Sequence, residues 1–275
     1  MVKLRICGTN CGGLQMKFKS LLFSSVLLLS ACSVIEDQPL EQETENVEEQ
    51  TETEAEEQEE VSWEEQMVEK LPETASLDDW NLVLVGPWNE LSKDFKPELV
   101  EVNNQQEIDA RIESAWDAWY QAALEAGHRL FFASGYRSIE LQEINFDSTV
   151  QQNINAGMSE EEAIEKAKEY LTVPGHSEHH TGLALDIVDE EWIVEGNGLD
   201  PEYETQASQQ WLVDTMTDFG FILRYPENKE EVTGILYEPW HFRYVGKENA
   251  KFIVDHELAL EEYIDLLTLR DEMNK

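Results

Sequence analysis

Cysteine is almost absent from this 275-residue chain. The three cysteines are Cys7, Cys11 and Cys32, and none follows Cys32. A domain formed by the later residues therefore has no disulfide bond, and it must depend on its hydrophobic core or on a bound metal ion for stability.

Positive charge is also scarce. The chain has 19 Lys and Arg residues against 59 Asp and Glu residues, which gives a formal net charge of -40. Such an excess of negative charge makes nucleic acid and anionic lipid surfaces poor partners.

The segment 36–65 contains no Lys or Arg and almost no large apolar residue. A segment of this composition cannot bury enough surface to order itself. We therefore expect residues 33–70 to form an acidic disordered tether. An alternative interpretation is an acidic interaction tail that recruits a basic partner.

No apolar run near the N-terminus is long enough to span a membrane, because a spanning helix needs about 20 residues. Residues 16–32 instead combine a basic start, a short apolar stretch and small residues before Cys32. The run L-S-A-C that ends at Cys32 matches the lipobox of bacterial lipoproteins. We expect residues 1–32 to be a lipoprotein signal peptide, with Met16 as an alternative start and Cys32 as the lipid-bearing residue.

Potential metal ligands occur in two segments, S-E-H-H-T-G-L-A-L-D at 177–186 and E-P-W-H at 238–241. A hydrolytic zinc site takes three protein ligands and leaves a fourth position for water. His179, Asp186 and His241 are the candidate zinc ligands. Glu238 is the candidate general base, which would take a proton from the attacking water.

A different pairing of histidines is conceivable, because His176 and His180 stand four apart, as the ligands of H-E-x-x-H helices do. The local sequence argues against a helix. P-G precedes this cluster, a glycine follows it, and 183–188 is a short apolar run, so a loop leading into a strand is favoured. A carboxylate buried in that run, Asp186, needs a partner, and a metal ion would provide one.

The pattern S-x-H-x-x-G-x-A-x-D at 177–186 resembles the signature of the VanY-like D-alanyl-D-alanine carboxypeptidases. These are zinc peptidases of the LAS group, named for lysostaphin, D-Ala-D-Ala metallopeptidases and sonic hedgehog. E-P-W-H resembles their second motif, which implies Glu238 as the base and His241 as the last ligand. S-G-Y-R-S at 134–138 resembles the segment that carries a substrate-facing arginine, here Arg137. The resemblance extends over about 77–246.

The resemblance also implies contacts with the terminal residue of the substrate, although less specifically. The residues concerned are Gln142, Ser177 and Tyr225, with Ser134 and Tyr136 as further candidates in the S-G-Y-R-S segment. We expect Tyr136 to contribute packing rather than catalysis.

Two roles are open to Arg137. Its guanidinium would stabilise the oxyanion that forms during hydrolysis, or it would grip the free carboxylate of the substrate as a planar fork. The plainer alternative is a turn residue in a solvated ion pair.

Residues 71–275 suffice for one domain with a single core. Periodicity and breaker residues predict strands at 82–85, 130–133, 221–225 and 237–244, and helices over 108–127, 159–170, 211–219 and 248–269. Pro239 would let the last strand depart from regular pairing where Glu238 and His241 must reach one metal. The resemblance implies an α+β fold in which a small, mostly antiparallel sheet carries the zinc and helices flank it.

These observations predict a zinc D,D-carboxypeptidase that removes the terminal D-alanine from peptidoglycan stem peptides. With the lipid anchor, it would act outside the cell membrane, facing the wall. One alternative is an L,D-carboxypeptidase that acts on tetrapeptide stems. Another is a non-catalytic, zinc-containing wall-binding module, which would have no need of a base such as Glu238.

Overall fold

The computed structural model describes residues 61–275. The predicted signal peptide, Cys32 and most of the predicted tether lie outside these residues. Within 61–275, no helix is both long and apolar enough to span a bilayer.

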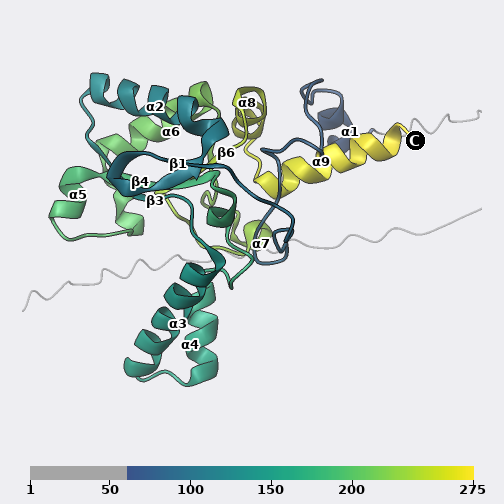
Figure 1. The fold of residues 1–275 in the computed structure, drawn as a ribbon. Helices are drawn as coiled ribbons and strands as arrows, with labels where there is room; N and C mark the ends of the chain where they lie inside the picture. Colours follow the sequence, from purple (N-terminus) through teal and green to yellow (C-terminus); the bar gives the residue numbers. More distant parts are fainter. Residues whose placement is uncertain (1–60) are drawn as a thin grey trace, which may run out of the picture. The chain divides into compact units, whose positions relative to one another are not determined.

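Four short strands form the central sheet of the described residues in the order β3-β4-β6-β5, and every neighbouring pair is antiparallel. Figure 1 labels β3, β4 and β6 of this sheet. The bounds of the strands are β3 (Leu130–Ser134), β4 (Ala184–Asp189), β5 (Phe221–Leu223) and β6 (His241–Tyr244). A separate two-stranded ladder pairs β1 (Leu99–Glu101) with β2 (Glu107–Asp109). The α+β prediction with a small antiparallel sheet is confirmed.

α2 and α6 lie beside the sheet, α3 and α4 form a pair that projects away from it, and α1 lies near α9 (Figure 1). The α-helices are α1 (Trp63–Val68), α2 (Glu113–Ala126), α3 (Ile139–Asn155), α4 (Glu160–Lys168), α5 (Glu190–Val194), α6 (Ala207–Phe219), α7 (Glu230–Thr233), α8 (Lys247–Asp255) and α9 (Leu260–Met273). Single 3-10 turns are η1 (Asn103–Gln105), η2 (Ala110–Ile112), η3 (Glu178–Thr181) and η4 (Pro201–Thr205).

The alternation of side chains along β4 and β6 gives the sheet two different faces. Leu185 and Phe242 belong to a core in which α2 and α6 contribute Trp119 and Leu212. Asp186, the next residue of β4, necessarily points to the opposite face. The sheet is therefore packed on one side and carries polar chemistry on the other.

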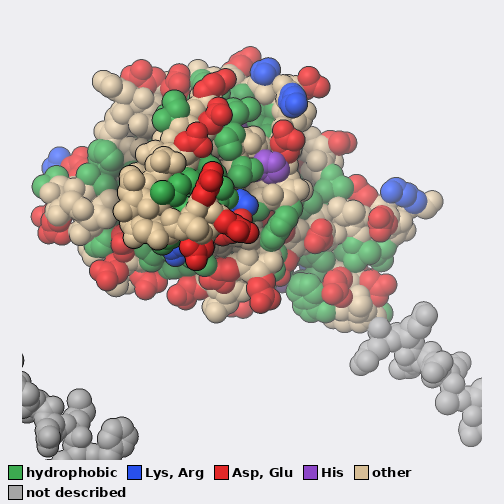
Figure 2. Space-filling view, turned by 90° about the horizontal axis from the view of Figure 1, so that it is seen from below, with side chains coloured by type: hydrophobic (Ala, Val, Ile, Leu, Met, Phe, Trp, Pro, Cys, Tyr) green, Lys and Arg blue, Asp and Glu red, His purple; other side chains and the backbone are tan. Residues whose placement is uncertain are grey.

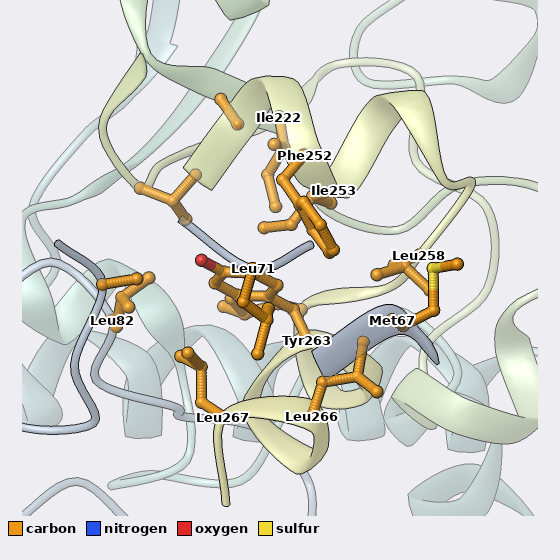
Figure 3. Packing of buried hydrophobic residues seen from close by; sticks show 14 residues of the cluster. Met67, Leu71, Leu82, Ile222, Phe252, Ile253, Leu258, Tyr263, Leu266 and Leu267 are labelled. Carbon is orange, nitrogen blue, oxygen red and sulfur yellow. The ribbon is translucent and has the colours of Figure 1, made fainter. Parts of the chain in front are cut away.

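A second core joins the two ends of the described chain (Figure 3). Met67 of α1 and Leu71 are buried with Tyr263 and Leu267 of α9. The folded domain therefore begins before residue 71, the start that the sequence predicted. The acidic composition up to residue 65 concealed this, because only Met67 of α1 is buried.

The predicted strand at 82–85 does not form, although Leu82 and Val85 are buried. The guanidinium of Arg243 donates hydrogen bonds to the carbonyls of Asn81 and Val83. A side chain thus satisfies backbone groups that a neighbouring strand would otherwise pair.

The helix predicted from residue 108 starts only at Glu113, because Ile108 lies in β2 and Ile112 in η2. The predicted C-terminal helix is divided into α8 and α9 by a turn in which Glu257 has φ of 54°. Both differences arise because buried apolar side chains continue with helix-like spacing across a break in the backbone.

Acidic side chains are widespread on the face shown in Figure 2, and basic side chains are few there. The acidic composition of the whole chain is therefore visible on the surface of the folded domain as well.

Candidate zinc site

Strand register brings the sequence motifs together. Ser134 pairs with Asp186 across β3 and β4, and Asp186 pairs with His241 across β4 and β6. The β3–β4 register shifts between Phe132 and Ser134, an irregularity of the kind that re-aims side chains beside active sites. Three motifs that are far apart in the sequence thus meet on one row of the sheet.

The three predicted ligands converge. One ligand atom from each of His179, Asp186 and His241 lies within 4.8 Å of the others, and all three residues are buried. Asp186 Oδ2 is 3.2 Å from His179 Nε2, and Asp186 Oδ1 is 3.0 Å from His241 Nδ1. This is a compact set of two imidazoles and a carboxylate, which suits zinc.

Backbone contacts fix the orientation of His179. Its Nδ1 donates to the carbonyl of Gly135 at 2.7 Å, so its Nε2 is free to bind metal. Burial lowers the pKa of His179, which favours the neutral imidazole that ligates a metal ion.

Asp186 Oδ1 is buried and accepts no hydrogen bond from the part of the chain that the structure describes, as expected of an atom that has a cation for a partner. Burial alone would raise the pKa of the Asp186 carboxyl, but His179 and His241 outweigh it and hold the pKa well below its usual range. Burial likewise opposes the charged form of His241, but the adjacent carboxylates of Asp186 and Glu178 raise its pKa to about 9. A bound metal ion would displace that proton, so the donor set fits zinc.

Glu238 lies beside the ligands, with Oε2 3.5 Å from His241 Nδ1. Its amide donates to the Tyr225 carbonyl at 3.1 Å, and the His241 amide donates to the Glu238 carbonyl at 3.2 Å. Pro239 therefore lies in a turn ahead of β6 and not within a strand, and this turn aims both side chains at one point. Burial raises the pKa of Glu238 to about 8, and the charge of Asp186 adds to this effect.

Arg137 points at the same site. Its guanidinium donates to Ser134 Oγ at 2.8 Å and to Gln142 Oε1 at 2.9 Å, and it lies 3.7 Å from Asp186 Oδ2. Only 12% of the Arg137 side chain is exposed, so the alternative of a solvated ion pair on a turn is wrong. Ser134 and Gln142 orient this guanidinium.

The alternative pair of histidines does not form a metal site. His180 donates through Nδ1 to the carbonyl of Arg137 at 2.6 Å, and its Nε2 accepts from the amide of Gly175 at 3.1 Å. His176 Nδ1 contacts the carbonyl of Gly86 at 3.0 Å. Both side chains bind the backbone of neighbouring loops, and His180 thereby fixes the turn that presents Arg137.

A cavity of about 370 Å³ opens over the ligands. Among the predicted substrate contacts, Gln142, Ser177 and Tyr225 line this cavity, whereas Ser134 and Tyr136 do not. Ser134 acts through Arg137, and the partly buried Tyr136 donates its amide to the Glu107 carbonyl. Hydrophobic walls come from Leu171, Ile235 and Trp240.

Three buried residues beside the site, Glu178, Arg224 and Arg243, were not identified from the sequence. Glu178 is fully buried beside the site, and its carboxylate contacts both Arg224 and Arg243. The sequence contained a signal, because Glu178 is a charged residue between two buried motif positions. The two arginines that neutralise it lie on β6 and just after β5, and no sequence pattern connects them to Glu178.

The buried ligand set, the carboxylate of Glu238 and the inward-facing Arg137 define a zinc metallopeptidase. Residues 105–247 match the family model described as VanY, D-alanyl-D-alanine carboxypeptidase. The chain belongs to this family, and the non-catalytic alternative is thereby set aside.

Similar proteins agree with this assignment. A D-alanyl-D-alanine carboxypeptidase of Enterococcus faecalis (strain ATCC 700802 / V583) is 36% identical over 202 residues, which cover 74% of this chain and 72% of that protein. A variant of the vancomycin-resistance D,D-pentapeptidase VanY from a VanB-type cassette, solved with Zn(II), gives a TM-score of 0.61 at 36% identity, covering 68% of this chain and 99% of that one. The LD-carboxypeptidase LdcB gives 0.57 at 36% identity, covering 68% and 86%.

Proposed function

We propose that this protein is a D,D-carboxypeptidase, which removes the C-terminal D-alanine from peptidoglycan stem peptides that end in D-Ala-D-Ala. The observation that carries the proposal is the position of Glu238 and Arg137 around the ligand set at the floor of one cavity. The description of the matching family and the activity named for the enterococcal relative point to the same substrate.

The residues divide the chemistry between them. Zinc, when bound, supplies Lewis acidity toward water and the scissile carbonyl. Glu238 takes a proton from the attacking water and returns it to the leaving amine. A pKa of about 8 in the metal-free site suits proton return, and a nearby cation would lower it toward the range of a base at neutral pH.

Arg137 follows β3 and supplies positive charge to the site, whereas Glu238 precedes β6. Its guanidinium is 3.7 Å from a ligand oxygen, Asp186 Oδ2, so it lies close to where the reacting carbonyl must be. We therefore favour stabilisation of the oxyanion as its main role over capture of the substrate's carboxylate.

An L,D-carboxypeptidase that acts on tetrapeptide stems is the second candidate. LdcB, which is described as an LD-carboxypeptidase, is as similar in sequence to this chain as the VanY variant is, at 36% identity in both cases. The zinc chemistry is common to both reactions, and the two differ only in the residue that precedes the bond to be cleaved.

Defined stem peptides separate the two activities. Purified protein is incubated with pentapeptide and tetrapeptide stems, and the products are weighed by mass spectrometry, with Glu238→Gln as the inactive control. We expect the pentapeptide to lose one alanine and to stop at the tetrapeptide. Conversion of the tetrapeptide to the tripeptide would favour the L,D activity, and no cleavage of either peptide would contradict both.

We also propose that a lipid on Cys32 holds the enzyme on the outer side of the cell membrane. The support is the L-S-A-C run that ends at Cys32 and the acidic segment 36–65, which has the composition of an extended spacer. Labelling cells with a clickable fatty acid should label the wild-type protein and not Cys32→Ala. A wild-type protein that takes up no label and is freely secreted would overturn this proposal.

A further inference from the structure

Glu178 is a buried carboxylate that the catalytic steps do not use. Its side chain has no solvent exposure, and Oε1 accepts from Arg224 Nε at 2.8 Å and from Arg243 Nη1 at 2.6 Å. Both of these hydrogen bonds go to the same oxygen. The orientation of the carboxylate is therefore set by two arginines.

The other oxygen of Glu178 faces the metal site. Oε2 lies 3.5 Å from Nε2 of His241, and both atoms are buried without a hydrogen-bond partner among residues 61–275. His241 presents its Nδ1 to Asp186 and Glu238, so its Nε2 points away from the ligand set. An Nε2–H group would have Glu178 as its acceptor.

We propose that Glu178 is a positioning residue for zinc binding: it holds His241 in the tautomer that carries the proton on Nε2 and leaves Nδ1 free for the metal. A carboxylate that accepts from the remote nitrogen of a ligating imidazole fixes the ring and strengthens the ligand. His179 is fixed in the opposite tautomer by the carbonyl of Gly135. The two histidine ligands would thus bind one zinc through different nitrogens.

The two arginines make the substitution Glu178→Gln informative. Because Arg224 and Arg243 both donate, they require the amide oxygen of the glutamine at the position of Oε1. The amide NH2 group then occupies the position of Oε2 and faces His241 Nε2, a donor against a donor. His241 can relieve this conflict only by moving its proton to Nδ1, the atom that must bind zinc, or by turning away.

The inference concerns the zinc site and is independent of which stem peptide is cleaved, because its readout is metal binding and not turnover. The matched control is Glu261→Gln. The carboxylate of Glu261 accepts hydrogen bonds from Arg224 Nη1 at 2.8 Å and from Arg224 Nη2 at 2.6 Å. Glu261→Gln therefore removes one negative charge from the same cluster, as Glu178→Gln does, and leaves the contact between Glu178 and His241 unchanged.

The experiment measures the zinc dissociation constant of the purified full chain by competition with a chelating dye, and the visible absorption of the Co²⁺-substituted protein. We expect Glu178→Gln to weaken zinc binding by about 10- to 100-fold and to change the Co²⁺ spectrum. Glu261→Gln should remain within about threefold of wild type, a free-energy difference under ~1 kcal/mol, and should keep the spectrum. Equal losses in both variants, or no loss in Glu178→Gln, would overturn the proposal.

A measurement on the wild type covers the case in which Glu178→Gln does not fold. Long-range ¹H–¹⁵N correlation spectra of ¹⁵N-histidine-labelled protein distinguish the two tautomers, and the ligands are the histidines whose signals change on zinc addition. We expect one ligand protonated on Nδ1 and the other on Nε2. Two ligands that are both protonated on Nδ1 would leave Glu178 nothing to accept, and the proposal would be wrong.

Discussion

Glu238 owes its position to the backbone, because the turn at Pro239 hydrogen-bonds to Tyr225 on one side and leads into His241 on the other. Replacing its carboxylate with an amide should therefore leave the fold and the ligands in place. Glu238→Gln should keep its zinc and lose turnover by roughly 10²- to 10⁴-fold, since an amide cannot accept the proton of water. Metal analysis and kcat on a stem peptide test this prediction.

The matched control for this prediction is Glu231→Gln, an exposed residue of α7 outside the cavity. It should retain wild-type kcat. If Glu238→Gln kept activity within about tenfold of wild type, which corresponds to ~1.4 kcal/mol of barrier, another group would have to be the base.

The ligands and the base could be predicted from the sequence because two histidines, an aspartate and a glutamate in short motifs are residue types that bind metal or accept a proton. Glu178 was not identified, and His180 was considered only as an alternative ligand, because their contacts depend on partners that only the fold supplies. Glu178 needs Arg243 from β6, and His180 needs the carbonyl of Arg137. Motif spacing carries no information about such contacts.

Among the elements, the junction between η3 and β4 is the most constrained. Gly182 has φ of 70°, and a Cβ at this position would lie 2.7 Å from the amide nitrogen of Asp109. That amide donates to the Gly182 carbonyl at 3.0 Å, so β2 holds the junction in place. The close approach fixes the path of the chain between His179 and Asp186, the first two ligands.

Gly182→Ala should therefore lower the free energy of unfolding and weaken zinc binding together. The matched control is Gly157→Ala. Gly157 has φ of 105°, but no described atom lies within 4 Å of a Cβ added there. In both variants the alanine would be held at a positive φ, which costs about 1–3 kcal/mol of backbone strain. Only in Gly182→Ala would the added Cβ also clash with the backbone of Asp109. Urea unfolding and zinc titration should show a larger loss in Gly182→Ala. Equal losses would mean that the contact with Asp109 does not constrain the ligand loop.

Elements with clear local signals were predicted well. The capping box of Ser159 and Glu162 starts α4, and Gly127 and Gly220 end α2 and α6 in the left-handed region. α3 was not predicted, because only three of its 17 residues are buried and its apolar pattern is weak. The strand at 82–85 failed for a tertiary reason, since Arg243 takes the carbonyls that a strand would pair.

Over the whole molecule, charge of the two signs is distributed unequally. Acidic side chains are spread over the surface in Figure 2, while Arg137, Arg224 and Arg243 point inward, and the last two have no solvent exposure at all. Some of the few positive charges of the chain therefore lie in the interior, beside the zinc site. These buried arginines do little to offset the repulsion between acidic groups on the surface.

A net charge of -40 should consequently make the stability of the protein depend on salt. At about 0.01 M ionic strength, charges interact over ~30 Å, and at about 0.1 M over ~10 Å. Raising NaCl through this range should screen the repulsion and raise the midpoint of urea unfolding of the zinc-loaded protein. KCl at the same ionic strength should act alike, whereas an uncharged osmolyte at equal osmolality serves as the control for excluded-solute effects. A midpoint that stays constant or falls between the two ionic strengths would mean that ion pairs among the surface residues already balance the repulsion.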